Sequence, residues 1–303
     1  MQKYDLCCIG HITLDKVVTP QKTVYMPGGT SFYCSHAIRH FDDINFGLIA
    51  SLAKSELDVV KDLESKGVDV NVVYSNKSVY FENVYGENQD DRTQRVLAKA
   101  DPFVIENVDG IDSTIYFLGA LLADDFSLEF VRELSEKGLV AVDSQGYLRK
   151  VENENVFAID WADKLEFLKY VHFLKVNEME LEVLTGESDI QKASKMLYSW
   201  GVKEVVVTLG SMGSVIYDGK EFYPIPAYKP ASVIDATGCG DTYMTGYLYK
   251  RALGKSYTEA AEFGAAMATM KIENTGPFSG QESDVLQRIS NSEKTLPVVD
   301  ACR

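Results

Sequence analysis

The stretch Val233-Ile234-Asp235-Ala236-Thr237-Gly238-Cys239-Gly240-Asp241-Thr242 decides how this 303-residue chain is interpreted. Two glycines flank a small residue, and an aspartate follows them at the start of a helix predicted over residues 240–253. A helix start leaves several backbone N–H groups without partners, and the helix dipole adds positive potential there. Glycine also lets an anion approach the backbone closely. The pattern therefore predicts an anion-binding loop at Gly238, Cys239 and Gly240.

Asp241 allows two interpretations on this local pattern. Aspartate after a glycine turn is typical of a helix N-cap. A carboxylate beside an anion-binding loop is also placed to take the proton of a hydroxyl that attacks phosphorus. The two roles do not exclude each other.

Outward from this loop, short β-branched runs alternate with longer segments of helical periodicity. This rhythm is typical of an α/β fold with a mainly parallel sheet and helices on both faces. The predicted strands are residues 4–9, 46–50, 115–118, 140–143, 172–176 and 204–209, and the predicted helices are 31–41, 56–66, 127–137, 160–168, 190–200, 240–253 and 258–272. No linker rich in Pro, Gly or Ser divides the chain, so we expect a single domain over residues 1–303.

Two segments interrupt this rhythm. Residues 14–26 alternate around a turn at 19–22, and residues 78–99 alternate around a polar turn at 86–91, which predicts antiparallel hairpins. So few strands do not form a core of their own. They form either a small β lid over a cleft or extra edge strands of the main sheet. The exposed edges of a lid favour pairing with a second copy, so a homodimer through the lid is the expected assembly.

Charge and composition exclude several classes of protein. Lys and Arg total 30 against 45 Asp and Glu, a formal charge of -15, which disfavours binding to nucleic acid or to anionic membranes. No apolar run is long enough to span a bilayer, and the N-terminal residues do not resemble a signal peptide. The cysteines form no C-x-x-C pair; they are Cys7, Cys8, Cys34, Cys239 and Cys302. We therefore expect a reduced, cytoplasmic protein that acts on a small molecule.

Four motifs in order resemble those of the ribokinase-like carbohydrate kinases, the PfkB family. Residues 235–241 are similar to the family's D-T-x-G-A-G-D signature, with Ala236 and Cys239 as small replacements for Thr and Ala. The other three are the G-G motif at Pro27-Gly28-Gly29-Thr30-Ser31, the N-x-x-E segment at Asn177-Glu178-Met179-Glu180, and the T-L-G-x-x-G turn at Thr208-Leu209-Gly210-Ser211-Met212-Gly213. The resemblance covers nearly the whole chain. It implies a three-layer α/β/α fold with a mostly parallel central sheet and a small β lid formed from about residues 14–26 and 78–99.

The resemblance also implies an ATP-dependent kinase that phosphorylates a hydroxyl of a sugar or polyol. Asp241 would be the base, and the N–H groups of Gly238, Cys239 and Gly240 would stabilise the γ-phosphoryl group. For Glu180, which the resemblance assigns to Mg²⁺, the alternative is a structural role at an acidic helix start on a solvated face. The other implied residues are Asn177, Thr208, Gly210 and Gly213 for the nucleotide, Asn177 and Glu180 for Mg²⁺ through water, and the carbonyls of Asp235 and Thr237 with the loop 274–277 for a monovalent cation such as K⁺.

On the substrate side, the resemblance implies that Asp15 grips hydroxyls and that Gly28 and Gly29 form the hinge toward the lid. Tyr33 stands where ribose and fructose kinases commonly carry Asn, and Arg149 ends a segment that departs from their D-x-N-x-R pattern. We expect Tyr33 and Arg149 to contact the substrate, although Arg149 alternatively covers the end of the sheet. Both departures weaken the match to a furanose substrate.

Three alternatives therefore remain for the function. An inositol-type kinase would stack an aromatic residue on the ring of its substrate. A nucleoside kinase would need an aromatic base pocket, for which Phe32, Tyr33 and Tyr80 are candidates. A non-catalytic sugar-binding regulator could use the same fold, but it would not need a base at Asp241.

Overall fold

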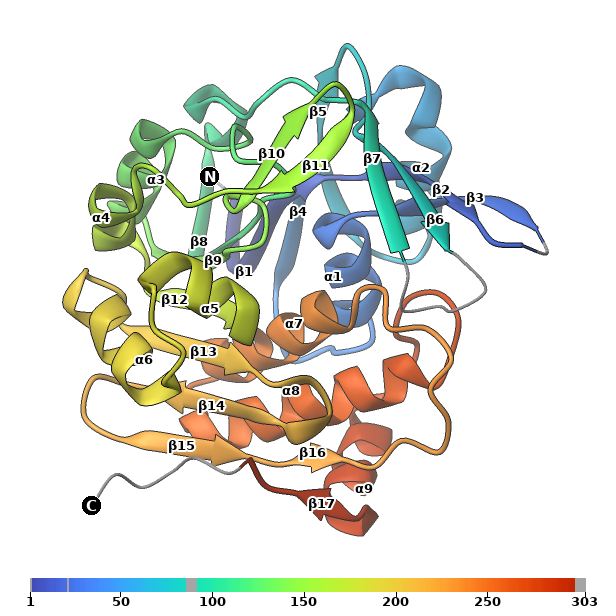
Figure 1. Ribbon diagram of the computed structural model, residues 1–303. Helices are drawn as coiled ribbons and strands as arrows, with labels where there is room; N and C mark the ends of the chain where they lie inside the picture. The colour runs from blue at the N-terminus through green and yellow to red at the C-terminus, as the bar shows by residue number, and fades with distance from the viewer. Residues whose placement is uncertain (1, 21, 86–91, 298–303) are drawn as a thin grey trace.

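The computed structural model describes residues 2–20, 22–85 and 92–297 (Figure 1). The strands of its central sheet are β1 (Gln2–His11), β4 (Phe46–Ala53), β5 (Asp69–Ser75), β8 (Ile111–Gly119), β9 (Leu139–Asp143), β12 (Phe173–Asn177), β13 (Glu204–Thr208), β14 (Ser214–Tyr217) and β15 (Phe222–Ile225). The nine strands lie in the order β15-β14-β13-β12-β9-β8-β1-β4-β5. Neighbours from β13 to β5 pair in parallel, and β14 and β15 add an antiparallel edge. The predicted mostly parallel sheet is confirmed.

Helices cover both faces of this sheet, because alternate strand residues point to opposite sides. On β1, Cys7 and Ile9 belong to one apolar core, whereas Leu6 and Cys8 belong to the other. The first core is closed by α3 (Leu128–Ser135), α4 (Lys164–Phe167), α5 (Glu178–Thr185) and α6 (Ile190–Ser199), and the second by α1 (Thr30–Ile38), α2 (Leu57–Ser65), α7 (Cys239–Ala252), α8 (Tyr257–Ile272) and α9 (Glu282–Asn291). Short helical turns lie at Lys54–Glu56, Ile105–Val108, Leu168–Tyr170 and Gly210–Met212. The arrangement is a three-layer α/β/α sandwich.

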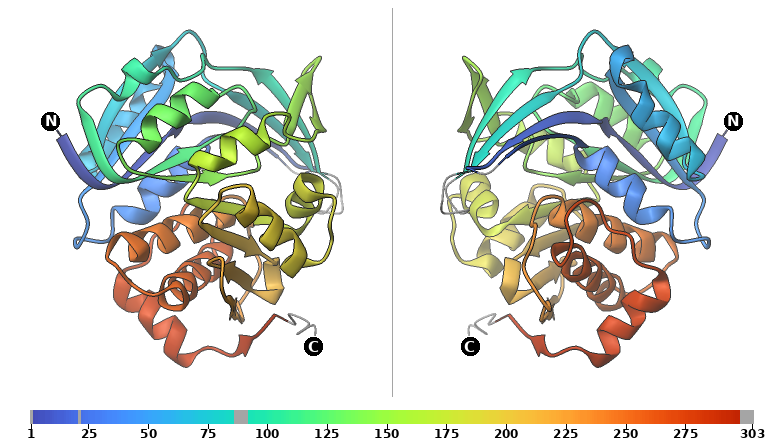
Figure 2. Two further views of the ribbon diagram at one scale, coloured as in Figure 1. Left: turned by 90° about the vertical axis from the view of Figure 1, so that its left-hand side faces the viewer. Right: turned by 90° about the vertical axis from the view of Figure 1, so that its right-hand side faces the viewer.

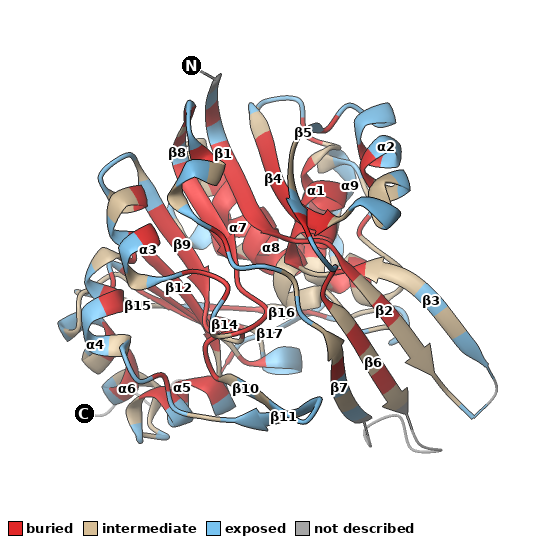
Figure 3. Ribbon diagram, turned by 90° about the horizontal axis from the view of Figure 1, so that it is seen from above, coloured by how far each residue is buried: buried red, intermediate tan, exposed pale blue. Residues whose placement is uncertain are grey.

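A second sheet of six strands stands beside the sandwich (Figure 3). Its strands are β2 (Thr13–Val18), β3 (Thr23–Gly28), β6 (Tyr80–Tyr85), β7 (Arg92–Ala98), β10 (Arg149–Glu152) and β11 (Asn155–Ala158), in the order β10-β11-β7-β6-β2-β3. The pairs β2–β3 and β6–β7 are antiparallel, as predicted, and they form a sheet of their own rather than extending the central one. In the two views of Figure 2 this sheet lies on the side of the molecule away from the N-terminus. The predicted turn at residues 86–91 and Cys302 lie outside the described residues.

Several elements were not predicted from the sequence. They include β5 at the edge of the central sheet, the β10–β11 hairpin in the second sheet, and α9, together with a two-stranded ribbon of β16 (Ala227–Tyr228) and β17 (Lys294–Thr295). None of the helices in the described ranges is both long and apolar enough to cross a membrane.

The fold brings the predicted motifs to one edge of the central sheet. Parallel strands place their carboxyl ends together, so Asp143 of β9, Asn177 of β12 and Thr208 of β13 lie at the same edge. The start of α1 contacts α7 on the second face of the sheet, which brings the first turns of these helices close to that edge.

Candidate active site

The predicted anion-binding loop lies at the N-terminus of α7. Gly238 immediately precedes the helix with φ +76°, and a Cβ there would lie 2.3 Å from the ring of Tyr33, so the position requires glycine. Within the described residues, the N–H groups of Gly238, Gly240 and Asp241 have no acceptor in the chain. Cys239 differs from the prediction, because its N–H donates to the carbonyl of Ala236 at 3.2 Å. Three backbone donors therefore remain available to an anion.

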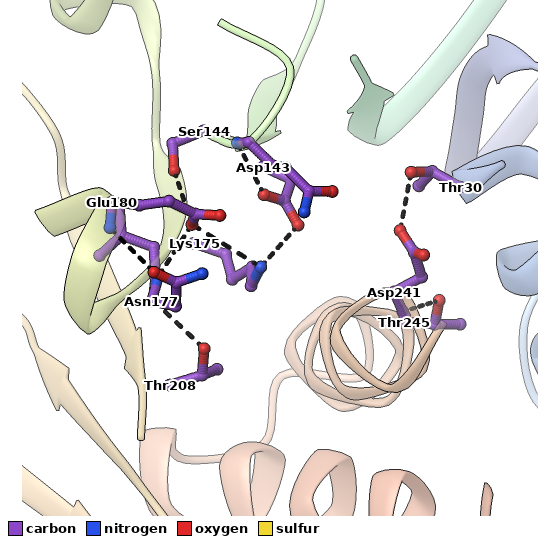
Figure 4. Close-up of polar contacts among 11 residues, drawn as sticks. Thr30, Asp143, Ser144, Lys175, Asn177, Glu180, Thr208, Asp241 and Thr245 are labelled. Carbon is purple, nitrogen blue, oxygen red and sulfur yellow. Dashed lines mark hydrogen bonds and ion pairs between the residues drawn. The ribbon is translucent and has the colours of Figure 1, made fainter. Parts of the chain in front are cut away.

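Asp241 lies in the first turn of α7, but its carboxylate does not cap that helix. Instead, Oδ1 accepts a hydrogen bond of 2.7 Å from Oγ1 of Thr30, the first residue of α1 (Figure 4). The carboxylate thus joins the anion-binding loop to the Gly28-Gly29-Thr30 turn, two motifs more than 200 residues apart in the sequence. The N-cap interpretation of Asp241 is wrong.

The surroundings of Asp241 set how readily it takes a proton. Burial and the negative charge of Asp143 raise the pKa of Asp241 to about 6. The hydrogen bond from Thr30 and the positive charges of Lys175 and Arg149 act in the opposite direction. A carboxylate with this pKa is mostly ionised at neutral pH and still basic enough to accept a proton from a reacting hydroxyl.

A buried ion pair lies beside the loop and was missed by the sequence analysis. Nζ of Lys175 lies 2.9 Å from Oδ2 of Asp143 and 4.0 Å from Oε2 of Glu180 (Figure 4). Burial opposes the positive charge, but the two carboxylates outweigh it and hold the pKa of Lys175 above its usual value. A Cβ on Gly240 would lie 3.3 Å from Nζ, so the ammonium group directly adjoins the anion-binding loop. A lysine near the carboxyl end of an otherwise apolar strand was the available signal.

Asn177 and Glu180, predicted to hold Mg²⁺, form a capping box at the start of α5. Oδ1 of Asn177 accepts the N–H of Glu180 at 2.8 Å, and Oε2 of Glu180 accepts the N–H of Asn177 at 2.8 Å and the hydroxyl of Ser144 at 3.0 Å. Glu180 is 8% exposed, so it is not part of a solvated helix face. Its Oε1 has no donor within the described ranges, which fits contact with an Mg²⁺ ion through water.

The predicted nucleotide-side residues lie next to Asn177. Thr208 pairs with Asn177 in the sheet register, and its Oγ1 donates to the carbonyl of Val176 at 3.3 Å. Gly210 and Gly213 both have positive φ, +56° and +98°, in the turn that follows β13. A Cβ on Gly213 would lie 2.2 Å from the carbonyl oxygen of Ile225, so this turn packs tightly against the hairpin behind it.

The predicted substrate-side residues gather where the second sheet meets α1. Oδ1 of Asp15 on β2 accepts a hydrogen bond of 2.7 Å from Thr13, and a Cβ on Gly28 would lie 2.4 Å from Oδ2. Gly29 directly precedes α1 with φ +85°. Arg149 begins β10, and its charge acts on Asp241, as described above. The second sheet therefore contributes both a carboxylate and a guanidinium group to this region.

The aromatic residues proposed for substrate contact lie deeper than expected. Phe32 and Tyr33 of α1 are only 6% and 2% exposed, and the ring of Tyr33 lies against Gly238. The hydroxyl of Tyr33 is buried without a hydrogen-bond partner in the described structure. Tyr80 belongs to a different element, β6 of the second sheet. In this conformation Tyr33 packs against the anion-binding loop, and neither ring offers an open aromatic face.

The predicted monovalent-cation site holds a lysine. The carbonyl oxygen of Asp235 accepts a hydrogen bond of 2.7 Å from Nζ of Lys271, and Oδ1 of Asp235 accepts the N–H of Thr237 at 2.9 Å. A carbonyl expected to bind K⁺ is thus already engaged by a cationic side chain, and the residues present do not fit a second cation.

Comparison with known proteins identifies the family. A sequence model described as pfkB family carbohydrate kinase matches residues 58–284. A cytidine kinase of Thermococcus kodakarensis is 25% identical over 286 residues, 91% of this chain and 98% of the relative. A pyrophosphate-dependent kinase of the ribokinase family, solved with a pyrophosphate analogue and myo-inositol, has a TM-score of 0.81 and 25% identity over 93% of this chain and 99% of its own.

The fold extends to more distant members. Ribokinase of Arabidopsis thaliana, solved with ribose and ATP, has a TM-score of 0.77 and 20% identity over 95% of this chain and 99% of its own, which supports the ribokinase-like fold. The matched relatives are kinases, and their names include nucleoside, sugar and inositol kinases. This chain belongs to the pfkB family of carbohydrate kinases and is a phosphotransferase of the ribokinase type.

Proposed function

We propose that this kinase transfers the γ-phosphoryl group of ATP to a hydroxyl of a sugar or polyol. The observation that carries the proposal is the Asp241 carboxylate, which lies on the same helical turn as the free N–H groups of Gly238 and Gly240. A base beside donors for a phosphoryl group is the combination that phosphoryl transfer to an alcohol requires. A protein that only bound sugars would not need this base.

In the proposed reaction, the acceptor hydroxyl attacks the γ-phosphorus, the bond to the bridging oxygen breaks, and ADP leaves. The hydroxyl proton moves to Oδ2 of Asp241, because Oδ1 accepts the Thr30 hydrogen bond. The N–H groups of Gly238 and Gly240 donate to the phosphoryl oxygens as negative charge accumulates there. Lys175, held by Asp143, adds positive charge beside the same loop.

The donor is proposed to lie along the edge formed by Asn177, Thr208 and the turn of Gly210 and Gly213. Mg²⁺ bound there would neutralise charge on the β- and γ-phosphates. Glu180 holds Asn177 through the capping box and presents its remaining carboxylate oxygen for water-mediated contact. These residues position the donor, whereas Asp241 acts on the acceptor.

The acceptor is proposed to lie between Asp15 and Asp241. A carboxylate that accepts two hydroxyls suits a polyol, and Gly28 leaves room for the Asp15 carboxylate. A nucleobase pocket formed from Phe32 and Tyr33 is disfavoured by the burial of both rings. The myo-inositol bound to the similar pyrophosphate-dependent kinase also supports a polyol acceptor.

The six-stranded sheet is proposed to act as a lid. Only Ile12 separates β1 of the central sheet from β2 of the second sheet, so the connection is short. Closure over the acceptor would exclude water from the γ-phosphate and limit hydrolysis of ATP.

A matrix of donors and acceptors tests this function. ATP and pyrophosphate are each combined with ribose, fructose, myo-inositol and cytidine, and phosphorylated product is measured by mass spectrometry. We expect turnover with ATP and a sugar or inositol, and a loss of turnover of about 10²-fold or more in the Asp241→Asn variant. If cytidine were the only acceptor phosphorylated, the proposed sugar or polyol acceptor would be wrong. If only pyrophosphate supported turnover, the proposed donor, ATP, would be wrong. If an acceptor binds in calorimetry but no combination gives product, a non-catalytic sugar-binding regulator would be the better interpretation.

A further inference from the structure

Lys271 lies at the end of α8 and reaches the start of the anion-binding segment. Its side chain is completely buried. Nζ lies 2.7 Å from the carbonyl oxygen of Asp235 and 3.0 Å from Oδ2 of the same residue. The ammonium group therefore contacts both the backbone and the side chain of the residue that opens the 235–241 motif.

The backbone of α8 fixes the same residue. The carbonyl of Ile272 accepts the N–H groups of Ile234 and Asp235, at 2.8 and 3.2 Å. Oδ2 of Asp235 also accepts the N–H of Gly276 at 3.4 Å, which ties in the loop after the helix. Lys271 is thus at the centre of the contacts that join α8, the loop at 274–277 and the anion-binding segment.

The charges in this cluster are matched. Burial opposes ionisation of Asp235, but the N–H of Thr237 and the Lys271 ammonium outweigh it and hold the pKa of Asp235 below its usual value. A buried lysine needs such a partner, because an unpaired buried charge is strongly destabilising. A metal cation bound to the same carbonyl would lie next to the ammonium group and be repelled by its charge.

We propose that Lys271 is a positioning residue whose ammonium group performs the role of a bound monovalent cation. It holds the carbonyl and the carboxylate of Asp235, and through that carboxylate the 274–277 loop. It thereby sets the direction of the Gly238 and Gly240 N–H groups. The kinase therefore requires no K⁺ and is not activated by it. The inference rests on the proposed function only for its effect on turnover, since the ion preference of the folded protein is separate.

The first test uses the wild-type protein in tetramethylammonium chloride, with KCl or NaCl replacing this salt at constant ionic strength. We expect K⁺ and Na⁺ to give equal melting temperatures and equal phosphotransfer rates. A melting temperature or rate that rises specifically with K⁺ would overturn the proposal. The melting temperature decides the question even if no acceptor is phosphorylated, so failure of the proposed function would be recognised separately.

The second test removes the ammonium group. In Lys271→Ala we expect phosphotransfer to fall about tenfold or more, because a displaced loop misdirects its donors. K⁺ should then bind near Asp235, raise the melting temperature in a saturable manner and restore part of the rate. Lys250→Ala is the matched control, since Lys250 on α7 is also buried and paired, with Glu282, but lies outside this cluster. It should show no specific response to K⁺.

Two outcomes with the Lys271 variants would contradict the proposal. A folded Lys271→Ala protein with wild-type turnover, or with no response to K⁺ in either measurement, would contradict the assigned role. Lys271→Gln, which keeps a hydrogen-bond donor without the charge, replaces it if the alanine variant does not fold. The wild-type ion comparison stands in either case.

Discussion

At the scale of single residues, the protonation of Asp241 is controlled by neighbours from four other elements. Thr30 of α1, Lys175 of β12 and Arg149 of β10 stabilise the ionised carboxylate. Burial and Asp143 of β9 destabilise it. Only the ionised form can take a proton from the acceptor. The proposed activity should therefore fall as the pH decreases through about 6.

Replacing Thr30 by Val tests the first of these neighbours. Val keeps the shape of the side chain but removes the hydrogen bond that lowers the pKa of Asp241. We expect the acidic limb of kcat/KM to move to higher pH by about one unit, since a hydrogen bond to a charged group contributes about 1.5 kcal/mol. Thr245→Val is the matched control, because its hydroxyl donates to the backbone carbonyl of Asp241 and not to the carboxylate. An unchanged limb in Thr30→Val would rule out control of the base by Thr30.

Replacing Asp143 by Asn tests the opposite direction. The variant removes a negative charge that raises the pKa of Asp241 and frees Lys175 from its nearest partner. The acidic limb of kcat/KM should therefore move to lower pH, measured over the same pH range as for Thr30→Val. A shift of both variants in the same direction would contradict the assignment of the limb to Asp241.

Sequence patterns predicted the local chemistry at this scale but not its partners. The anion-binding loop around Gly238 and the position of Asp241 at the start of a helix followed from a short motif. Thr30 lies within the G-G motif and Lys175 lies two residues before the N-x-x-E segment. Nothing local indicated that Thr30 would bond Asp241 or that Lys175 would adjoin Gly240. Such contacts depend on how α1, α7 and β12 pack, and single-sequence patterns do not contain that information.

At the scale of elements, the start of α5 combines a structural and a proposed functional role. The Asn177–Glu180 capping box satisfies N–H groups of the helix and holds Glu180 against Ser144. The same arrangement of Ser256 and Glu259 begins α8, outside the proposed site. The two capping boxes allow capping to be separated from donor binding.

Asn177→Ala and Ser256→Ala should both lower the free energy of unfolding by about 1 kcal/mol, because each removes a helix cap. Only Asn177→Ala should also reduce kcat/KM for ATP, by about tenfold or more, if Asn177 contacts Mg²⁺ through water. Denaturant unfolding and steady-state kinetics measure the two effects. Equal kinetic effects in both variants would show that Asn177 only caps the helix and does not bind the donor.

The elements themselves were predictable where their pattern was strong. The buried parallel strands and long helices were found from periodicity alone. β5 was missed because it lies at the sheet edge and is only partly buried, and β10 and β11 because they are four residues each and largely exposed. Residues at such positions carry little hydrophobic pattern.

At the scale of the whole molecule, the six-stranded sheet leaves two edges, β10 and β3. β3 carries Tyr25, which is 60% exposed. An exposed edge with an aromatic residue favours pairing with another chain. We therefore still predict a homodimer that forms through the six-stranded sheet.

Sedimentation velocity tests this assembly. We expect the wild-type protein to sediment as a dimer and Tyr25→Lys to sediment as a monomer, because a charge on the edge opposes pairing. Tyr74→Lys is the control, since Tyr74 is 58% exposed on β5, at the edge of the central sheet. A monomeric wild-type protein across the concentration range would refute the dimer.

The most direct test of the central claim is the turnover of Asp241→Asn together with its affinity for ATP. Asparagine keeps the size of the side chain and can still interact with Thr30, but it cannot take the acceptor proton. We expect wild-type ATP affinity in calorimetry and a loss of kcat of about 10²-fold or more. Undiminished kcat in this variant would show that Asp241 is not the base and would contradict the account.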